Sequence, residues 1–329
     1  MIGWMFPGQG SQKPAMAAGL AYAGELFARA EPVIGANLEK LCASDEDPRW
    51  TPEVVQPALF VTSVAAAQTA LDLEMAPAAA AGHSLGELAA LVIAGSLEFE
   101  EGVRLVDVRG RAMAAAGRRN PGGMAAVIGL DPATIEQICA DEGDVWVANL
   151  NSPKQTVVSG KDKPLAAVAE SCLKAGAQRV IRLQVPVPSH CPLMEEARTE
   201  FEAELGKIGL EEPAFPIYCG ADGARHTESK EIAELVAAAL TSPVRFVDVV
   251  SSMRSDGIDV FVECGPGKVL RGLIRQIDPR AGSAALGSDE EAEALKESLG
   301  SSSESSTLSQ HIQRRKSMSS SKPALEVAP

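Results

Sequence analysis

Residues 82–87 read GHSLGE and place Ser84 between two glycines. The run before them is short and rich in alanine, and the run after them has the apolar spacing of a helix. A strand that turns sharply into a helix would present Ser84 at the helix N-terminus, where backbone N–H groups face incoming negative charge. This pattern is typical of a nucleophile elbow, and it predicts that Ser84 is a nucleophile. The alternative is a turn that merely contains a serine.

A serine hydroxyl is a weak nucleophile and needs a base within hydrogen-bond reach. His83 is adjacent in sequence, but neighbouring side chains at such a turn point to different sides. His190 lies in VPVPSHCPLM, where the prolines favour an extended approach back toward the main sheet. His226 and His311 lie in polar or serine-rich stretches. We therefore predict that His190 is the base.

The elements around these residues alternate between strands and helices. IGWMF at 2–6 predicts a buried strand that ends in the PGQG loop, and the alanine run before Ser84 predicts another strand. This alternation favours a parallel sheet with helices on both faces. Helices are expected over about 15–41, over 56–73 with Pro57 in the first turn, from the elbow to Gly95, and over 99–117.

The middle of the chain has a different order of elements. The pattern reads strand, helix, two strands joined at Pro153, helix and strand, which is the ferredoxin-like order. We therefore predict an inserted ferredoxin-like α+β subdomain at 122–187. The segments 1–121 and 188–286 would then form one discontinuous catalytic domain.

After this insert the strand and helix pattern resumes. Helices are expected over 191–208, from 228 until Pro243, and over 267–278 as the last helix, with strands at 216–220 and 257–265. From Gly287 the composition shifts to Ser, Glu and Lys, which leaves little apolar surface to offset the entropy of ordering. We predict a disordered tail over 287–329.

The composition excludes several classes of protein. The net charge of −14 argues against binding of nucleic acid, and no apolar run reaches the length of a membrane span. The six cysteines are widely scattered and there are four histidines, so neither a disulfide framework nor a metal site is expected. The first residues lack the features of a secretory signal, and we expect a cytoplasmic protein.

Seven motifs in the same order give the chain a resemblance to one family: FPGQGSQ (6–12), GHSLGE (82–87), VRLVDVRGRAM (103–113), NLNSPKQTVVSG (149–160), VPSHCPLM (187–194), SPVRF (242–246) and ECGPGKVL (263–270). The chain resembles the malonyl-coenzyme A:acyl carrier protein transacylases and the related acyltransferase domains of fatty acid and polyketide synthases. The resemblance covers nearly everything before the tail. It implies an α/β fold, with a hydrolase-like core on a mostly parallel sheet and an inserted ferredoxin-like subdomain.

The resemblance assigns roles to matching residues. Ser84 would be the nucleophile, His190 the base, and Arg109 the group that binds the free carboxylate of malonyl. A guanidinium can hold a carboxylate through two parallel hydrogen bonds, so a buried arginine beside the serine would select a dicarboxylate half-ester. The alternative for Arg109 is an ordinary place on the surface of a helix.

Three further residues match family positions in the pocket. Gln9 and Leu85 match the positions whose backbone N–H groups form the oxyanion hole, although Gln9 could also be a plain loop residue. Asn151 matches a position that lines the pocket, and the formation of a turn before Pro153 explains it equally well. Ala239 stands where many relatives have a glutamine. In the family a main-chain carbonyl of that segment orients the histidine, and alanine also supplies a carbonyl.

The implied activity is a two-step transfer of malonyl from malonyl-coenzyme A through Ser84 to the phosphopantetheine thiol of an acyl carrier protein, in fatty acid or polyketide biosynthesis. Leu85 after the serine, and VPSH rather than YASH, resemble the malonyl-selective members. No metal or resident cofactor is expected, and we expect a monomer without a nucleic-acid or membrane partner.

Two other functions are considered for the same chain. The Ser84 and His190 pair could serve an acyl-thioester hydrolase, in which a carboxylate clamp at Arg109 would have no use. A catalytically silent docking protein would have no need of the pair. Lys268, Arg271 and Arg275 share one face of the helix predicted over 267–278, which could meet an acidic carrier protein or simply be solvated.

Overall fold

A computed structural model of the chain describes residues 1–43 and 51–299. Its larger sheet runs in the order β10-β9-β1-β2-β7-β8, and the first five of these strands are parallel. The strands are β1 (Ile2–Phe6), β2 (Ala79–Gly82), β7 (Ile217–Tyr218), β8 (Arg225–His226), β9 (Val260–Cys264) and β10 (Gly282–Leu286). The predicted α/β class with a mostly parallel sheet is confirmed.

Helices cover both faces of this sheet because its central strand is apolar on both sides. On β1, Trp4 and Phe6 pack into one core cluster, whereas Met5 packs into a second cluster on the other face. The helices are α1 (Ala23–Ile34), α2 (Leu38–Ala43), α3 (Pro52–Asp72), α4 (Gly86–Ile93), α5 (Phe99–Arg119), α8 (Glu195–Ile208), α9 (Ser229–Ala238), α10 (Phe246–Ser255), α11 (Val269–Ile277) and α12 (Asp289–Leu299), with a 3-10 turn at Pro192–Met194.

Helix α3 lies in the centre of the larger core. It is apolar around its whole circumference, and among the described helices it is the one that is long and apolar enough to cross a membrane. In this fold 83% of that stretch is buried, which is the burial expected of the core helix of a globular domain.

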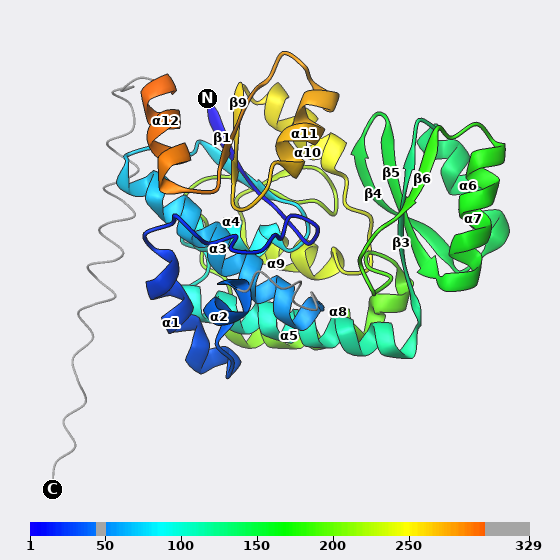
Figure 1. The fold of residues 1–329 in the computed structure, drawn as a ribbon, viewed down its shortest axis with the longest axis horizontal. Helices are drawn as coiled ribbons and strands as arrows, with labels where there is room; N and C mark the ends of the chain where they lie inside the picture. The colour runs from blue at the N-terminus through cyan, green and yellow to red at the C-terminus, as the bar shows by residue number, and fades with distance from the viewer. Residues whose placement is uncertain (44–50, 300–329) are drawn as a thin grey trace, which may run out of the picture.

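A second sheet forms a separate layer beside the first, at the right of Figure 1. Its order is β4-β5-β3-β6 and all its pairs are antiparallel, with α6 (Pro132–Glu142) and α7 (Asp162–Lys174) packed against it. The strands are β3 (Gly122–Ile128), β4 (Val145–Ser152), β5 (Gln155–Lys161) and β6 (Arg179–Arg182). This is the ferredoxin-like arrangement, and we propose the inserted subdomain at 122–187 on this basis.

One short backbone pairing joins the two layers. Val244, just before α10, accepts a hydrogen bond from the N–H of Leu150 and donates one to the carbonyl of Ala148, each at 2.9 Å. Strand β4 of the smaller sheet is therefore fixed to a loop of the larger part.

Several predicted helix boundaries were wrong. The helix expected over about 15–41 begins only at Ala23, because the chain before it makes turns in which Ala15 and Gly19 have positive φ. The helix expected at 56–73 begins at Pro52, so Pro57 lies inside it. The helix expected until Pro243 ends at Ala238, and α10 was not predicted.

The predicted disorder from residue 287 was wrong for α12. Ala292 and Leu295 of this helix pack into the larger core cluster, and Asp289 accepts hydrogen bonds from the N–H of Ala21 and from the Thr69 hydroxyl. Two apolar residues one turn apart and one tertiary cap therefore order a segment of otherwise polar composition. The remainder of the predicted tail, with His311, lies outside the described residues.

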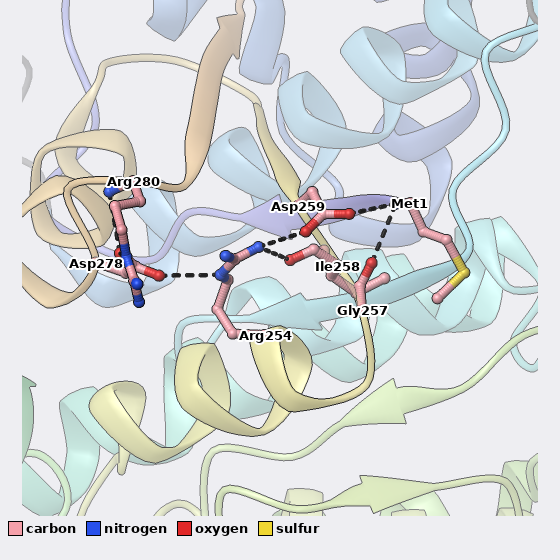
Figure 2. Close-up of polar contacts among 7 residues, drawn as sticks. All are labelled: Met1, Arg254, Gly257, Ile258, Asp259, Asp278 and Arg280. Carbon is pink, nitrogen blue, oxygen red and sulfur yellow. Dashed lines mark hydrogen bonds and ion pairs between the residues drawn. The ribbon is translucent and has the colours of Figure 1, made fainter.

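A polar cluster fixes one end of the parallel sheet (Figure 2). Arg254 of α10 donates to the Ile258 carbonyl at 2.8 Å, to Asp259 at 2.7 Å and to Asp278 at 3.0 Å. The amino group of Met1 donates to Asp259 and to the carbonyl of Gly257. Central strand β1 is thus held at its start, beside β9.

Candidate active site

Ser84 lies in the sharp turn between β2 and α4. Its φ is +57°, in the left-handed region that L residues rarely adopt. The flanking glycines permit the turn, since a Cβ on Gly82 would overlap the backbone of Glu87 and a Cβ on Gly86 would overlap the Phe6 carbonyl oxygen. The structure therefore has the nucleophile-elbow geometry that the sequence predicted.

A cavity of about 280 Å³ lies over this turn, between the two layers of the fold. Loops and helices of the larger part line one side, and strands β3 to β5 line the other. All the predicted site residues contribute to its lining: Gln9, Ser84, Leu85, Arg109, Asn151 and His190.

Arg109 reaches the nucleophile from α5. Its side chain is buried, with an exposed fraction of 4%, and Nη2 donates a hydrogen bond of 2.7 Å to the Ser84 Oγ. Nη1 donates to Gln56 Oε1, also at 2.7 Å. No carboxylate of the described chain forms an ion pair with Arg109, and burial lowers its pKa to about 10.

Gln56 is a site residue that sequence reasoning missed. It is buried in the first turns of α3, where it accepts from Arg109 and its Nε2 lies 3.4 Å from the sulfur of Met113. The available signal was an amide directly between apolar residues in the sequence VVQPALFV, because a buried amide needs a hydrogen-bond partner.

His190 approaches the cavity from the segment after the smaller sheet. Its φ is +61°, and its Nδ1 donates to the main-chain carbonyl of Ala239 at 2.6 Å. The expectation that Ala239 can still hold the ring through its backbone is confirmed. This bond leaves Nε2 with the lone pair of the neutral ring.

The electrostatic environment keeps His190 uncharged. Burial lowers its pKa to about 3, and the positive charge of Arg109 acts in the same direction. The ring is therefore a neutral acceptor at neutral pH. The hydrogen bond that Ser84 Oγ receives in this structure comes from Arg109, and the structure has none between Ser84 and His190.

Two backbone N–H groups border the cavity near Ser84. Gln9 lies in the loop after β1, and Leu85 precedes the first residue of α4. Among the described residues neither N–H has a hydrogen-bond acceptor. Gly8 brings the loop against the elbow so closely that a Cβ there would overlap the His83 carbonyl oxygen.

Asn151 joins the elbow to the smaller sheet. Its Oδ1 lies 2.9 Å from His83 Nε2, and its Nδ2 donates to Gln155 of β5 at 2.9 Å. Burial lowers the pKa of His83, so this ring too is neutral. The His83 ring is directed to Asn151, in accord with the choice of His190 as the candidate base.

The cysteines lie in the interior, and the basic residues at α11 differ in their exposure. The six cysteines are buried and free, and residues 1–43 and 51–299 contain no cluster of three His, Cys, Asp or Glu side chains that could hold a metal. On α11 Arg275 is exposed and Arg271 is half-buried, whereas Lys268, which directly precedes this helix, pairs with Glu291 at 3.4 Å. Val269, Leu270 and Leu273 of the same helix line the cavity.

Comparison with known proteins gives relatives of one family over most of the chain. Residues 3–288 match the acyl transferase domain family. The malonyl CoA-acyl carrier protein transacylase of Haemophilus influenzae is 39% identical over 286 residues, which cover 83% of this chain and 91% of the relative. The Escherichia coli K12 protein of the same name is 38% identical over 295 residues, covering 86% and 94%.

Solved structures agree with these relatives. The malonyl CoA-acyl carrier protein transacylase of Coxiella burnetii superposes with a TM-score of 0.87 at 36% identity, covering 91% of this chain and 97% of that one. A malonyl-transacylase in complex with a type II polyketide synthase acyl-carrier protein also gives 0.87, at 34% identity, covering 90% and 99%.

Proposed function

The chain belongs to the acyl transferase domain family, and on that premise we propose that it moves a malonyl group from malonyl-coenzyme A to the phosphopantetheine thiol of an acyl carrier protein. The observation that carries this proposal is the hydrogen bond from the buried Arg109 to Ser84. A buried cation beside a nucleophile, with no carboxylate paired to it, fits an acyl group that brings its own carboxylate.

In the first step the Ser84 oxygen attacks the thioester carbon. His190 Nε2 takes the hydroxyl proton as the C–O bond forms, and it returns this proton to the sulfur of coenzyme A as the C–S bond breaks. The free N–H groups of Gln9 and Leu85 would stabilise the negative charge on the carbonyl oxygen of the intermediate. The products are malonyl-Ser84 and the free thiol.

The second step repeats this chemistry in reverse. The carrier thiol gives its proton to His190 and attacks the ester carbon, and the C–O bond to Ser84 breaks. The proton then returns to the Ser84 oxygen, which restores the free enzyme. The acyl group travels on the serine throughout, so the proposed reaction requires no metal and no resident cofactor.

The substrate carboxylate also prepares the catalytic pair. Arg109 donates to the hydroxyl that must react, and its charge helps to lower the pKa of His190. A malonyl carboxylate would take the guanidinium N–H and neutralise this charge, which releases Ser84 and makes His190 a stronger base. An acetyl group can do neither, so the clamp favours malonyl in the chemical step as well as in binding.

The hydrolase alternative uses the same pair but gains nothing from Arg109. A simple ester or a long acyl chain would leave the guanidinium buried and unpaired, at a cost of several kcal/mol for an uncompensated charge. The relatives over the same span are transacylases, which supports transfer rather than hydrolysis.

The carrier protein is proposed to dock at the mouth of the cavity beside α11. This helix lines the cavity on one side and presents Arg275 to solvent. Every group used in the two steps comes from one chain, which supports action as a monomer. The buried free thiols fit a reducing compartment such as the cytoplasm.

Mass spectrometry of the intact protein and of its peptides tests the proposed function. Wild-type protein mixed with malonyl-coenzyme A should carry a malonyl group on the peptide that contains Ser84, and Ser84→Ala should carry none. Arg109→Ala should form the malonyl adduct about 10²-fold more slowly, since it loses the charged partner of the carboxylate, whereas acetyl-coenzyme A should be less affected.

Arg111→Ala is the matched control, because Arg111 lies on the same helix, is exposed and pairs with Asp107. It should form the adduct at the wild-type rate. The proposal fails if wild-type protein forms no malonyl adduct, or if the thioester is hydrolysed without transfer to a carrier thiol.

A further inference from the structure

Glu87 is a buried carboxyl group that the proposed mechanism does not use. It lies in the first turn of α4, three residues after the nucleophile, with an exposed fraction of 0%. Its Oε1 accepts the N–H of Gly220 at 2.9 Å, and its Oε2 is buried without a hydrogen-bond partner. A carboxylate with one bare buried oxygen is costly, so this site favours the uncharged acid.

The contact with Gly220 links the nucleophile to the segment that holds the base. The Gly220 carbonyl accepts the N–H of Arg245 at 2.8 Å, and the preceding residue, Val244, pairs with β4. The same segment supplies the Ala239 carbonyl that orients His190. A Cβ on Gly220 would lie 2.8 Å from Glu87 Oε1, so a side chain there would displace this carboxyl group.

The titratable groups around Glu87 come from α5 and from the segment that follows β7. Arg109 of α5 favours its ionised form, Asp222 in the turn after β7 opposes ionisation, and the buried thiol of Cys219 lies near enough for Glu87 to raise its pKa. Burial outweighs the hydrogen bond from Gly220 and the charge of Arg109, which both favour the ionised form, and raises the pKa of Glu87 to about 8. At neutral pH the guanidinium of Arg109 therefore has no charged partner within residues 1–43 and 51–299.

We propose that Glu87 is a positioning residue of the acyl transfer: in its uncharged form it ties the helix of the nucleophile to the segment that holds His190, and it leaves the charge of Arg109 to the substrate carboxylate. This proposal rests on the proposed function for the identity of that carboxylate. It makes Glu87 a determinant of substrate affinity that titrates above neutral pH.

The test compares malonylation of Ser84 in wild type, Glu87→Gln and Glu87→Ala, by rapid quench and intact-mass spectrometry at several pH values. The amide of Gln is uncharged at every pH and can still accept the Gly220 N–H. We expect Glu87→Gln to keep kcat within about twofold at pH 7 and Glu87→Ala to lose roughly 10- to 100-fold, since it releases the link between nucleophile and base.

The pH profile separates positioning from simple packing. As pH rises from 7 to 9 the wild-type KM for malonyl-coenzyme A should rise by about tenfold, because an ionised Glu87 competes for the charge of Arg109, and in Glu87→Gln this rise should be absent. Glu263→Gln is the matched control: Glu263 is also fully buried and accepts backbone N–H bonds, from Leu270 and Arg271. It should keep the wild-type rise.

An infrared difference spectrum of wild type minus Glu87→Gln gives a readout that does not depend on activity. It should contain the carbonyl stretch of a protonated carboxylic acid at pH 7 and lose it by pH 9. The proposal is overturned if Glu87→Gln is as slow as Glu87→Ala at pH 7, if its KM rises with pH as in wild type, or if the infrared band is missing at pH 7. Absence of any malonyl adduct in wild type would instead overturn the proposed function, and the infrared band would still report the state of Glu87.

Discussion

At the scale of single residues, the site depends on buried groups whose charge is set by their neighbours. Arg109 remains charged although burial lowers its pKa, whereas His190 is kept neutral by burial and by that same charge. A neutral imidazole whose Nδ1 is fixed by the Ala239 carbonyl can act only through Nε2. The tautomer required of a general base is therefore present before substrate arrives.

This environment predicts an unusual pH dependence. An ordinary histidine base would lose half its activity near pH 6.5, but the pKa of His190 in the free enzyme is about 3. We expect kcat/KM for malonylation of Ser84 to change little from pH 7.5 down to about pH 5, measured at each pH by rapid quench. A fall with a midpoint near 6.5 would contradict the buried, neutral histidine.

The lowered pKa of His190 leaves activity insensitive to mild acid, but it makes the stability of the fold sensitive to it. Below pH 6.5 the unfolded chain binds a proton at His190 that the folded chain does not bind, so the free energy of unfolding should decrease as pH falls through this range. His83, whose pKa is also lowered by burial, contributes in the same direction.

At the scale of elements, the sequence pattern predicted those features that depend only on residues close together in the chain. The elbow could be predicted because glycines stand at 82 and 86, where the structure has no space for a Cβ. The ferredoxin-like order could be predicted because strand and helix patterns of hydrophobic residues alternate along this part of the chain. Helix α10 was missed because it follows Pro243 and contains three serines within a short run. Its stability comes from Phe246, Val249 and Met253 in the second core cluster.

The contacts between distant elements could not be predicted from spacing. Nothing local in the sequence indicates that Gln56 meets Arg109, or that the Glu87 carboxyl meets Gly220. Helix α12 is a similar case, because its order depends on contacts with α3 and with the turn before α1.

Removal of the α12 cap should be measurable. We expect Asp289→Ala to lower the free energy of unfolding by about 1–3 kcal/mol, since it removes the charged acceptor of the Ala21 N–H and leaves the Thr69 hydroxyl only its longer contact with the Ala65 carbonyl. Urea unfolding followed by circular dichroism measures this change. Glu290→Ala, at an exposed neighbouring position, should change it by less than about 0.5 kcal/mol. Equal effects of the two variants would show that Asp289 does not hold the helix.

At the scale of the whole molecule, the net charge of −14 poses a problem for an acidic partner. Long-range repulsion would slow the encounter unless a local positive surface lies near the entrance to the site. Helix α11 offers one exposed positive charge for this purpose, Arg275, on the same helix as Val269, Leu270 and Leu273, which line the cavity. Lys268 contributes less, because it pairs with Glu291.

Charge reversal on α11 tests this docking surface. Arg275→Glu should raise the KM for the acyl carrier protein by about three- to tenfold and weaken its salt dependence, while malonylation from coenzyme A stays at the wild-type rate. Lys230→Glu makes the same change of charge at an exposed position on α9, and it should leave both half-reactions unchanged. A similar loss in both variants would indicate a general charge effect instead of docking at α11.

The left-handed backbone at Ser84 and His190 restricts which chemistries this fold can reach by single substitutions. Threonine offers the same hydroxyl as serine, yet its branched Cβ is poorly tolerated at a φ of +57°. Cysteine has an unbranched Cβ like serine. The backbone at position 84 therefore tolerates cysteine better than threonine, although threonine is chemically more similar to serine.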